Sequence, residues 1–249
     1  LLAVTGCSDF LDQTSPSDLE GDKVFNSAYY TELALNEAYG DMTLDATYSQ
    51  YIPIIWGLNT DCELVDGLGN DATNTASERG NMNYNSNPGW GSLSNLWNAM
   101  YGIIETTNTV ISGVESSTLL EEGSASEKKT MLRLKGEALT IRAMVYSDLI
   151  KFFGDIPMKF ETTNPNLSNV YLAKTDSDDI LDSLIIDLQE AIDYLPWAGE
   201  SNATTERITQ GYAHSLLANI ALTRAGWNIR EAAKSGYETA SFTDPTYPT

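Results

Sequence analysis

One stretch of the chain, residues about 125–153, constrains the fold more than any other. Apolar side chains recur there every three or four residues, the spacing that gathers them on one face of an α-helix. Gly154 follows where a left-handed C-terminal cap belongs, and residues 155–157 turn the chain away. A long amphipathic helix with a defined end is therefore the most strongly predicted element. The apolar stripe consists of Met131, Leu134, Ala138, Ile141, Val145, Leu149, Phe152 and Phe153.

Similar spacing elsewhere predicts five more helices and little strand, which indicates an all-α architecture. Ser92 opens one of these helices, which closes near Gly113. Another is expected to begin at Thr175, with Asp178 three residues on in an arrangement that resembles a capping box. The five helices are predicted over residues about 22–42, 92–114, 176–195, 209–225 and 229–241.

The helices are expected to form antiparallel pairs that stack. Residues 217–240 approximate a tetratricopeptide unit, in which small residues let two helices approach closely and a bulky residue wedges between them. The matching residues are Leu217, Ala218, Leu222, Gly226, Ala233, Tyr237 and Ala240. Because one such unit cannot bury its own apolar face, neighbouring pairs must cover it. The predicted fold class is all-α, with tetratricopeptide-like stacked helix pairs and long inserted loops.

The first residues resemble the end of a bacterial lipoprotein signal peptide. Residues 1–7 form an apolar run, LLAVTGC, with a small residue directly before Cys7. The export peptidase needs small residues before the lipid-modified cysteine, and the apolar stretch holds the chain in the membrane. Residues 8–18 are polar, acidic and turn-rich, as a tether would be. We therefore expect lipidation at Cys7 and an extracytoplasmic protein; the alternative is an ordinary apolar N-terminus that happens to contain a cysteine.

Charge and cysteine content exclude several classes of protein. With 14 basic and 35 acidic residues the formal net charge is −21, so the chain repels phosphate backbones and is not expected to bind nucleic acid. Once Cys7 is lipidated, only Cys62 remains and no internal disulfide can form. The fold must therefore rest on its apolar core.

Residues 134–157, LKGEALTIRAMVYSDLIKFFGDIP, resemble the signature helix of the SusD/RagB family, whose pattern is roughly G-E-A-x-x-L-R-A-x-x-Y-F-x-L-x-x-x-F-G-D-[IV]-P. Three shorter blocks resemble other parts of the family in the right order. They are residues 7–12 (CSDFLD), 96–104 (LWNAMYGII) and 207–213 (RITQGYA). Leu139, Val145 and Ser147 depart from the residues that are common in the family at these positions.

The resemblance implies a lipid-anchored, surface-exposed outer-membrane protein of Gram-negative bacteria. Such proteins capture glycans without catalysis or a cofactor and form a lid over a TonB-dependent transporter. Members are about twice this length, so the chain is expected to be a fragment that holds the helical part. The expected organisation is a signal-peptide remnant (1–6), a lipid tether and linker (7–21), and a SusD-like helical domain truncated at its C-terminus (22–249).

Residues 56–92 are the predicted ligand-binding loop. They contain seven Asn and six Gly without clear periodicity, and loops this long in compact domains are usually functional or disordered. A sugar site needs an aromatic face for the ring, with amide, carboxylate and guanidinium groups for its hydroxyls. In the resembled family the ligand surface draws on this same inter-helix region. The candidate glycan-binding residues, in order of preference, are Trp90, Tyr84, Asn81, Arg79 and Asp61.

Packing roles compete with ligand roles for the aromatic residues and the histidine. Trp90 has the alternative of packing against the start of the next helix. Trp97 and Tyr101 lie on a helical stripe and are predicted core residues, whereas Trp197 and Trp227 are expected to pack between helices. The single histidine, His214, is predicted to be a surface or packing residue rather than a catalytic base.

No familiar catalytic, zinc or nucleotide-binding motif supports an enzyme or a metalloprotein. Asp61, Asp66, Asn70 and Asp71 offer oxygen ligands for calcium but miss the EF-hand spacing, so no metal site is predicted. The predicted function is glycan capture by a binding module. The alternative is a repeat-based scaffold for proteins or peptides; a glycoside hydrolase would need a carboxylate pair whose geometry the sequence does not give. The particular glycan and the possibility of peptide cargo stay open at this point.

Overall fold

The computed structural model describes residues 21–57, 87–200 and 203–226. These residues are mostly helical, with a single pair of two-residue strands, which confirms the all-α prediction. Five long helices form the body: α2 (Ala28–Asp41), α4 (Gly91–Glu115), α6 (Ala125–Phe153), α7 (Ser177–Tyr194) and α8 (Gln210–Ala225). The short elements are α1 (Gly21–Phe25), the π-helical turn η2 (Asp45–Ser49), α3 (Tyr51–Gly57), α5 (Leu119–Glu122), β1 (Ile156–Pro157) and β2 (Lys174–Thr175).

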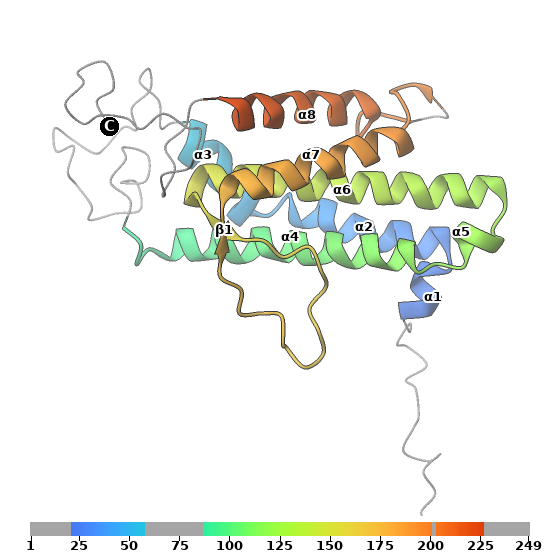
Figure 1. Cartoon of the computed structure of the whole chain (residues 1–249), viewed down its shortest axis with the longest axis horizontal. Coiled ribbons are helices and arrows are strands. Elements are labelled where there is room, and N and C mark those ends of the chain that lie inside the picture. Colours follow the sequence, from blue (N-terminus) through green and yellow to red (C-terminus); the bar gives the residue numbers. More distant parts are fainter. Residues whose placement is uncertain (1–20, 58–86, 201–202, 227–249) are drawn as a thin grey trace, which may run out of the picture.

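The long helices stack as antiparallel neighbours in the order α4, α6, α7 and α8, with α2 against α4 and α6 (Figure 1). Trp97 near the start of α4 meets Phe153 at the end of α6, with ring centroids 5.0 Å apart. Arg224 near the end of α8 reaches Asp182 near the start of α7, with Nε and Oδ1 2.8 Å apart. This is the tetratricopeptide-like stacking that the sequence predicts. The helix predicted over 229–241, and with it half of the predicted repeat unit, lies outside the described residues.

Helix α6 lies in the middle of the stack. Both its apolar face and part of its polar face are buried. Helix α7 covers the side that the sequence pattern assigns to solvent, and Gly136 allows this approach. A Cβ at Gly136 would lie 3.1 Å from a Leu195 side-chain carbon and 3.2 Å from the Ala191 carbonyl oxygen. As a consequence, several polar side chains of α6 are buried: Lys135, Glu137, Thr140, Arg142 and Ser147.

The two ends of α6 follow the sequence prediction in part. Ser124 and Glu127 form a reciprocal capping box, because the Glu127 N–H donates to Ser124 Oγ at 3.3 Å and the Ser124 N–H donates to Glu127 Oε2 at 2.8 Å. At the other end Gly154 has the expected positive φ of 69°, but its ψ of −128° lies outside the left-handed helical region. The predicted left-handed cap is therefore wrong in its detail.

The start of α7 also differs from the prediction. Asp176 is the N-cap, and its side chain accepts from the Asp178 N–H at 2.9 Å. Thr175 instead pairs with Ile156 in the antiparallel bridge between β1 and β2. The predicted cap at Thr175 is wrong because that residue is held in the strand pair.

The helix predicted over 22–42 is divided into α1 and α2. Ser27 caps α2, since its Oγ accepts from the Tyr30 N–H at 3.5 Å. Asn26, between the two helices, accepts from the Thr118 N–H at 2.8 Å near the start of α5. A polar Asn-Ser pair therefore ends one helix and begins the next, which apolar periodicity alone does not reveal.

The ring of Phe25 in α1 packs directly against Gly113 of α4. A Cβ at Gly113 would overlap the Phe25 ring, whereas a Cβ at Gly102 of the same helix meets nothing within 4 Å. Replacing a mid-helix glycine by alanine stabilises by about 0.5–1 kcal/mol when nothing opposes it. We expect Gly102→Ala to raise the denaturant midpoint and Gly113→Ala to lower it, because α1 is displaced. Equal midpoints for the two variants would contradict this packing.

Residues 158–173, between β1 and β2, are called the projecting loop. They extend away from the helices on the side of the stack that also carries α1 (Figure 1). The loop is the long insertion that the described residues contain. None of the described helices has the length and apolar character that crossing a membrane requires.

Candidate functional site

Trp90 is the one predicted glycan-binding residue that falls within the described part of the chain. It is half-buried and immediately precedes α4 as its N-cap. Its N–H donates to the Asn87 carbonyl at 3.0 Å, and its own carbonyl accepts from the Leu93 N–H at 3.2 Å. Unlike Trp97, its indole is not among the described side chains that pack against the core. The other predicted site residues lie outside the described residues: Tyr84, Asn81, Arg79, Asp61 and the lipidation site Cys7.

The packing roles predicted for other rings are confirmed where the chain is described. Trp97 and Tyr101 pack against the core, with ring centroids 4.8 Å apart. Trp197, just after α7, stacks on His214 of α8 at 5.7 Å and 20°. Both residues thus join α8 to the segment that leads into it. Trp227 lies outside the described residues.

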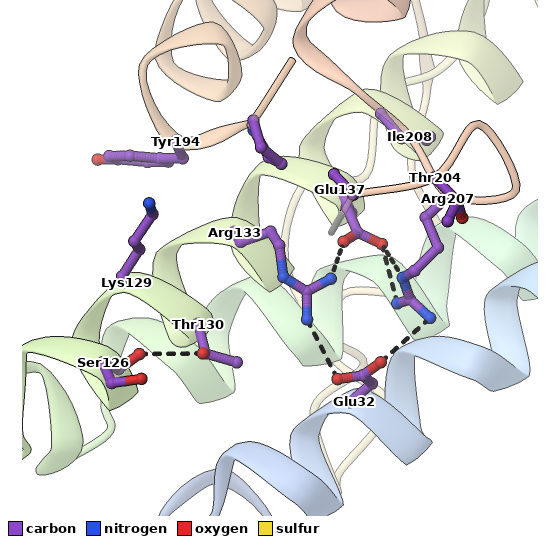
Figure 2. A pocket seen from close by; sticks show the side chains of 12 residues that line it. Glu32, Ser126, Lys129, Thr130, Arg133, Glu137, Tyr194, Thr204, Arg207 and Ile208 are labelled. Atoms are coloured by element: carbon purple, nitrogen blue, oxygen red, sulfur yellow. Dashed lines mark hydrogen bonds and ion pairs between the residues drawn. The ribbon is translucent and has the colours of Figure 1, made fainter. Parts of the chain in front are cut away.

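A cleft of about 490 Å³ lies between α2, the first half of α6 and the connection from α7 to α8. Figure 2 shows Glu137 of α6 between the guanidinium groups of Arg133 and Arg207, with Glu32 of α2 facing both. Trp90 lies at the opposite end of α6 from this cleft, since the start of α4 meets the end of α6. The cleft and Trp90 are therefore separate places. The remaining lining residues are Ser126, Lys129, Thr130, Tyr194, Pro196, Ala203, Thr204 and Ile208.

Glu137 is the buried centre of the ionic network in this cleft. Its side chain is 1% exposed, and one carboxylate oxygen accepts from Arg133. The other oxygen accepts from Arg207 Nε at 2.9 Å and from the Tyr39 hydroxyl at 2.8 Å. Glu32, at the rim, lies 3.1 Å from Arg133 Nη2 and 3.4 Å from Arg207 Nη1. One carboxylate thereby joins α2, α6 and the connection into α8.

The protonation states of Arg207 and Tyr39 follow from their surroundings. Burial alone would lower the pKa of Arg207, but the Glu137 carboxylate more than offsets this and raises it. Burial, and then the charge of Glu137, raise the pKa of Tyr39 far above its ordinary value. Arg207 therefore stays charged and Tyr39 stays protonated at neutral pH. The network therefore holds helices together and is not arranged for proton transfer.

Arg142 of α6 is the centre of a second buried network. Its side chain donates to Asp187 Oδ2 through Nε at 3.0 Å and Nη2 at 2.7 Å, and through Nη1 to Asn108 Oδ1 at 2.8 Å. The guanidinium also lies 4.2 Å from the centre of the Phe160 ring. Burial raises the pKa of Asp187, and the Arg142 guanidinium opposes that rise. This network ties α4, α6 and α7 to the start of the projecting loop.

Tyr146 holds the same start of the loop from α6. Its hydroxyl accepts from the Lys159 N–H at 2.8 Å and donates to the Lys159 carbonyl at 3.0 Å. Its ring centroid lies 5.3 Å from that of Phe160 and 6.3 Å from that of Tyr101. Burial raises the pKa of Tyr146 to about 12, so the hydroxyl keeps its proton. Tyr101 adds a hydrogen bond of 2.7 Å from its own hydroxyl to the Pro157 carbonyl.

The signature stretch thus has a structural explanation in this chain. Gly136 admits α7, Glu137 and Arg142 join helices, and Tyr146 holds the loop. Asp155 accepts from the Ser177 N–H at 2.9 Å and so anchors the start of α7. The sequence offered one signal for these roles, the spacing of Arg133 four residues before Glu137. Nothing in the sequence pointed to their distant partners, Glu32, Tyr39, Asn108, Asp187 and Arg207.

Metal binding finds no support in the described ranges, which hold no group of three or more His, Cys, Asp or Glu side chains placed to bind an ion. The cleft instead pairs carboxylates with guanidiniums. Its geometry serves cohesion between helices.

A stack of antiparallel helix pairs whose buried charges serve packing is the architecture of a tetratricopeptide-like helical-repeat protein. The chain belongs to the SusD-like family, since the family model described as "Starch-binding associating with outer membrane" matches residues 9–222. This confirms the resemblance that the signature stretch carries.

Individual relatives agree with this membership. The chain is 27% identical to a SusD-like protein of Formosa agariphila over 225 residues, which is 90% of this chain and 41% of the relative. It is 29% identical to a SusD-like protein of Bacteroides ovatus over 136 residues, covering 55% of this chain and 23% of the relative. The chain therefore spans less than half the length of these relatives.

Solved structures show the same fold. A SusD homolog from Bacteroides thetaiotaomicron matches with a TM-score of 0.73 at 24% identity, covering 85% of this chain and 39% of that one. Surface glycan-binding protein A from Bacteroides uniformis matches with a TM-score of 0.63 at 21% identity, over 80% and 42%. A laminarin-binding SusD-like protein matches with a TM-score of 0.57 at 21% identity, over 78% and 39%.

Proposed function

We propose that this chain is the helical part of a lipid-anchored outer-membrane protein that captures glycans and works with a TonB-dependent transporter in nutrient uptake. The observation that carries the proposal is the family match over residues 9–222. The relatives named for surface glycan binding and laminarin binding, which share the fold, support the ligand class.

We propose that the protein binds glycans without cleaving them. Glu137 and Asp187, the buried carboxylates of the two networks, are each held by arginine. His214, the single histidine of the chain, is stacked on Trp197. A sugar ring would instead be held by aromatic stacking and side-chain hydrogen bonds, the chemistry of the residues proposed in the 56–92 loop. Incubation with the bound polysaccharide should release no new reducing ends; their appearance would overturn the non-catalytic proposal.

Glycan capture predicts retention in a polysaccharide gel. Soluble protein that starts after Cys7, with the full C-terminal part of its gene product, is run through gels containing laminarin, starch or other polysaccharides. We expect one polysaccharide class to retard it and Trp90→Ala to weaken the apparent affinity at least about tenfold, equivalent to about 1.4 kcal/mol. Trp197→Ala is the control, because Trp197 is also solvent-accessible, at 48%, but stacks on His214.

Two results would count against this proposal in different ways. Folded wild-type protein that no polysaccharide retards would refute glycan capture and favour the peptide-binding or scaffold alternative. Retardation that Trp90→Ala leaves unchanged would keep glycan capture but remove Trp90 from the site.

Membrane attachment is proposed to depend on the thiol of Cys7. The support is the apolar run that ends at this cysteine and the polar, acidic stretch that follows it. We expect a clickable fatty acid fed to expressing cells to label the wild-type protein, and Cys7→Ser to remove both the label and the protein from the membrane fraction. Cys62→Ser, the matched control, should retain both. Labelling that survives Cys7→Ser would refute the anchor.

A further inference from the structure

The tip of the projecting loop exposes an apolar patch. Tyr171 is 98% exposed and Leu167 59%, and Leu172 and Val170 are 40% and 37% exposed. Single exposed apolar residues are ordinary on protein surfaces, but four of them within six positions form the kind of patch that marks an interaction site. Among the described residues the Tyr171 side chain has no hydrogen bond or ring contact.

Hydrogen bonds within the loop hold the turn that carries Leu167 and leads into the other three patch residues. The Asn164 N–H donates to Asn169 Oδ1 at 2.9 Å, and Asn169 Nδ2 donates to the Thr162 carbonyl at 2.8 Å. The Ser168 N–H donates to Asn166 Oδ1 at 3.1 Å. Between them Leu167 adopts a φ of 58°, which leucine disfavours and which these hydrogen bonds maintain. Preorganisation of this kind lowers the entropic cost of binding a partner.

The base of the loop is anchored to α4 and α6. Glu105 of α4 pairs with Lys159 and accepts from the Thr163 N–H at 2.6 Å. Burial would raise the pKa of Glu105, but the hydrogen bonds from Lys159 and Thr163 outweigh it and lower the pKa. Asn108 Nδ2 donates to the Lys159 carbonyl at 2.9 Å, and Phe160 lies under Arg142. Burying an arginine–aspartate pair carries a desolvation cost, and here the pair positions a loop whose tip adds nothing to the core.

The loop also lies on the side of the molecule where the tether begins. Thr162 of the loop, Phe25 of α1 and the next residue, Asn26, line one small pocket of about 220 Å³. Gly21 starts α1 and follows Cys7 by fourteen residues, a reach of at most about 50 Å. With Cys7 lipidated, the start of α1 stays within about 50 Å of the membrane surface.

The chemistry of the tip favours a protein partner over a lipid or a sugar. Residues 160–173 contain no Lys or Arg, and the chain carries a net charge of −21, so anionic lipid headgroups are disfavoured. Sugar sites are concave and need unengaged polar groups. This loop projects from the helical stack (Figure 1), and its Asn and Ser side chains bond within the loop. Tyrosine is among the residues that are enriched at the energetic centres of protein interfaces.

We propose that the projecting loop is a docking element that inserts Tyr171 and Leu172 into an apolar hollow on a membrane-embedded protein. This inference rests on the proposed function, under which that protein is the TonB-dependent transporter. The buried network of Arg142, Asn108 and Asp187 would then hold the start of the loop in the position needed for docking.

The test uses the tagged full-length lipidated protein in its own bacterium, extracted in mild detergent, with the co-purified transporter quantified by mass spectrometry. We expect Tyr171→Ser combined with Leu172→Ser to reduce co-purification at least about tenfold, while the unfolding midpoint and polysaccharide retention stay at wild-type values. Ile186→Ser is the control, because Ile186 is 65% exposed on α7 and lies outside the loop. It should leave co-purification unchanged.

Other outcomes of these experiments would contradict the docking proposal, the proposed function, or both. Undiminished co-purification of the transporter with the double variant would overturn the docking role and leave the proposed function intact. A wild-type protein that brings down no transporter would refute the proposed partnership and this inference with it. Two further outcomes would also overturn it: loss of polysaccharide retention in the double variant, which indicates a sugar contact, or Tyr171-dependent binding to phosphatidylethanolamine–phosphatidylglycerol vesicles, which indicates a lipid contact.

Discussion

Replacing Arg142 with methionine is expected to cost about 3–5 kcal/mol of unfolding free energy, because it leaves a buried carboxylate without its cation. Arg142 is 4% exposed and Asp187 is 8% exposed, so water cannot readily take over the lost hydrogen bonds. The measurement is the free energy of unfolding in denaturant at neutral pH. Alongside the loss of stability, we expect faster amide exchange around Lys159, since the start of the projecting loop loses its contact with the guanidinium.

Two control variants separate the charge effect from the loss of a side chain. Arg224→Met removes a more exposed pair: Asp182 is 52% exposed and lies 2.8 Å from Arg224 Nε, and the buried Asp178 lies farther away, at 3.9 Å from Nη1. It should therefore cost less than Arg142→Met. The double variant Arg142→Met with Asp187→Leu leaves no unpaired charge and should recover most of the loss. If Arg142→Met were as mild as Arg224→Met, the idea of a desolvated pair would be wrong.

The pH dependence of Arg142→Met gives an independent check on the same pair. Burial already raises the pKa of Asp187 with Arg142 beside it, so removing the guanidinium raises that pKa further. A carboxylic acid whose pKa is higher in the folded state stabilises the fold at low pH and loses that contribution as the pH rises through the folded-state pKa. The deficit relative to wild type should therefore be smaller at about pH 5 than at about pH 8.

The second large effect is expected at Glu137. Glu137→Gln keeps the shape of the side chain but removes the charge that holds Arg133 and Arg207, and we expect a loss of about 2–3 kcal/mol. This is below the range for a fully buried pair, because the two arginine side chains are 23% and 27% exposed and water can partly replace their partner. Denaturant unfolding measures the loss. Amide exchange should also rise at the start of α8, which Arg207 ties to α6.

Glu32 supplies the matched control for this prediction. It bonds the same two arginines, but its side chain is 37% exposed. Glu32→Gln should therefore cost less than about 1 kcal/mol. Equal losses for the two variants would show that burial of Glu137 does not determine the strength of the network.

The sequence predicted the helices well because apolar periodicity reports directly on one buried face. It did so for α6, whose predicted range and observed bounds coincide. It failed at residues 26–27, where a polar pair divides a helix without interrupting the apolar spacing. It also failed at Thr175, because the strand pairing with Ile156 depends on residues nineteen positions earlier.

The buried charges were beyond sequence reasoning for a different physical reason. On a helix with one apolar stripe, Glu137 and Arg142 read as members of the solvent face. Only the second layer, α7 with the segment that follows it, removes them from water, and it supplies Asp187 and Arg207 as partners. Of the predicted glycan site, the described residues include Trp90 alone, which stays a candidate because its indole does not pack against the described core.

The partners of α6 lie on both sides of it along the chain, and this has a consequence for the order in which the protein forms. Tyr39 and Asn108 are synthesised before α6, but Asp187 and Arg207 follow it. A growing or translocating chain that has emerged only to the end of α6 cannot bury Arg142 without leaving its charge unpaired, and it lacks one of the two arginines that hold Glu137. The native packing of α6 must wait until residue 207 is available, so this region folds late and as one unit, and shorter N-terminal pieces remain open to proteases.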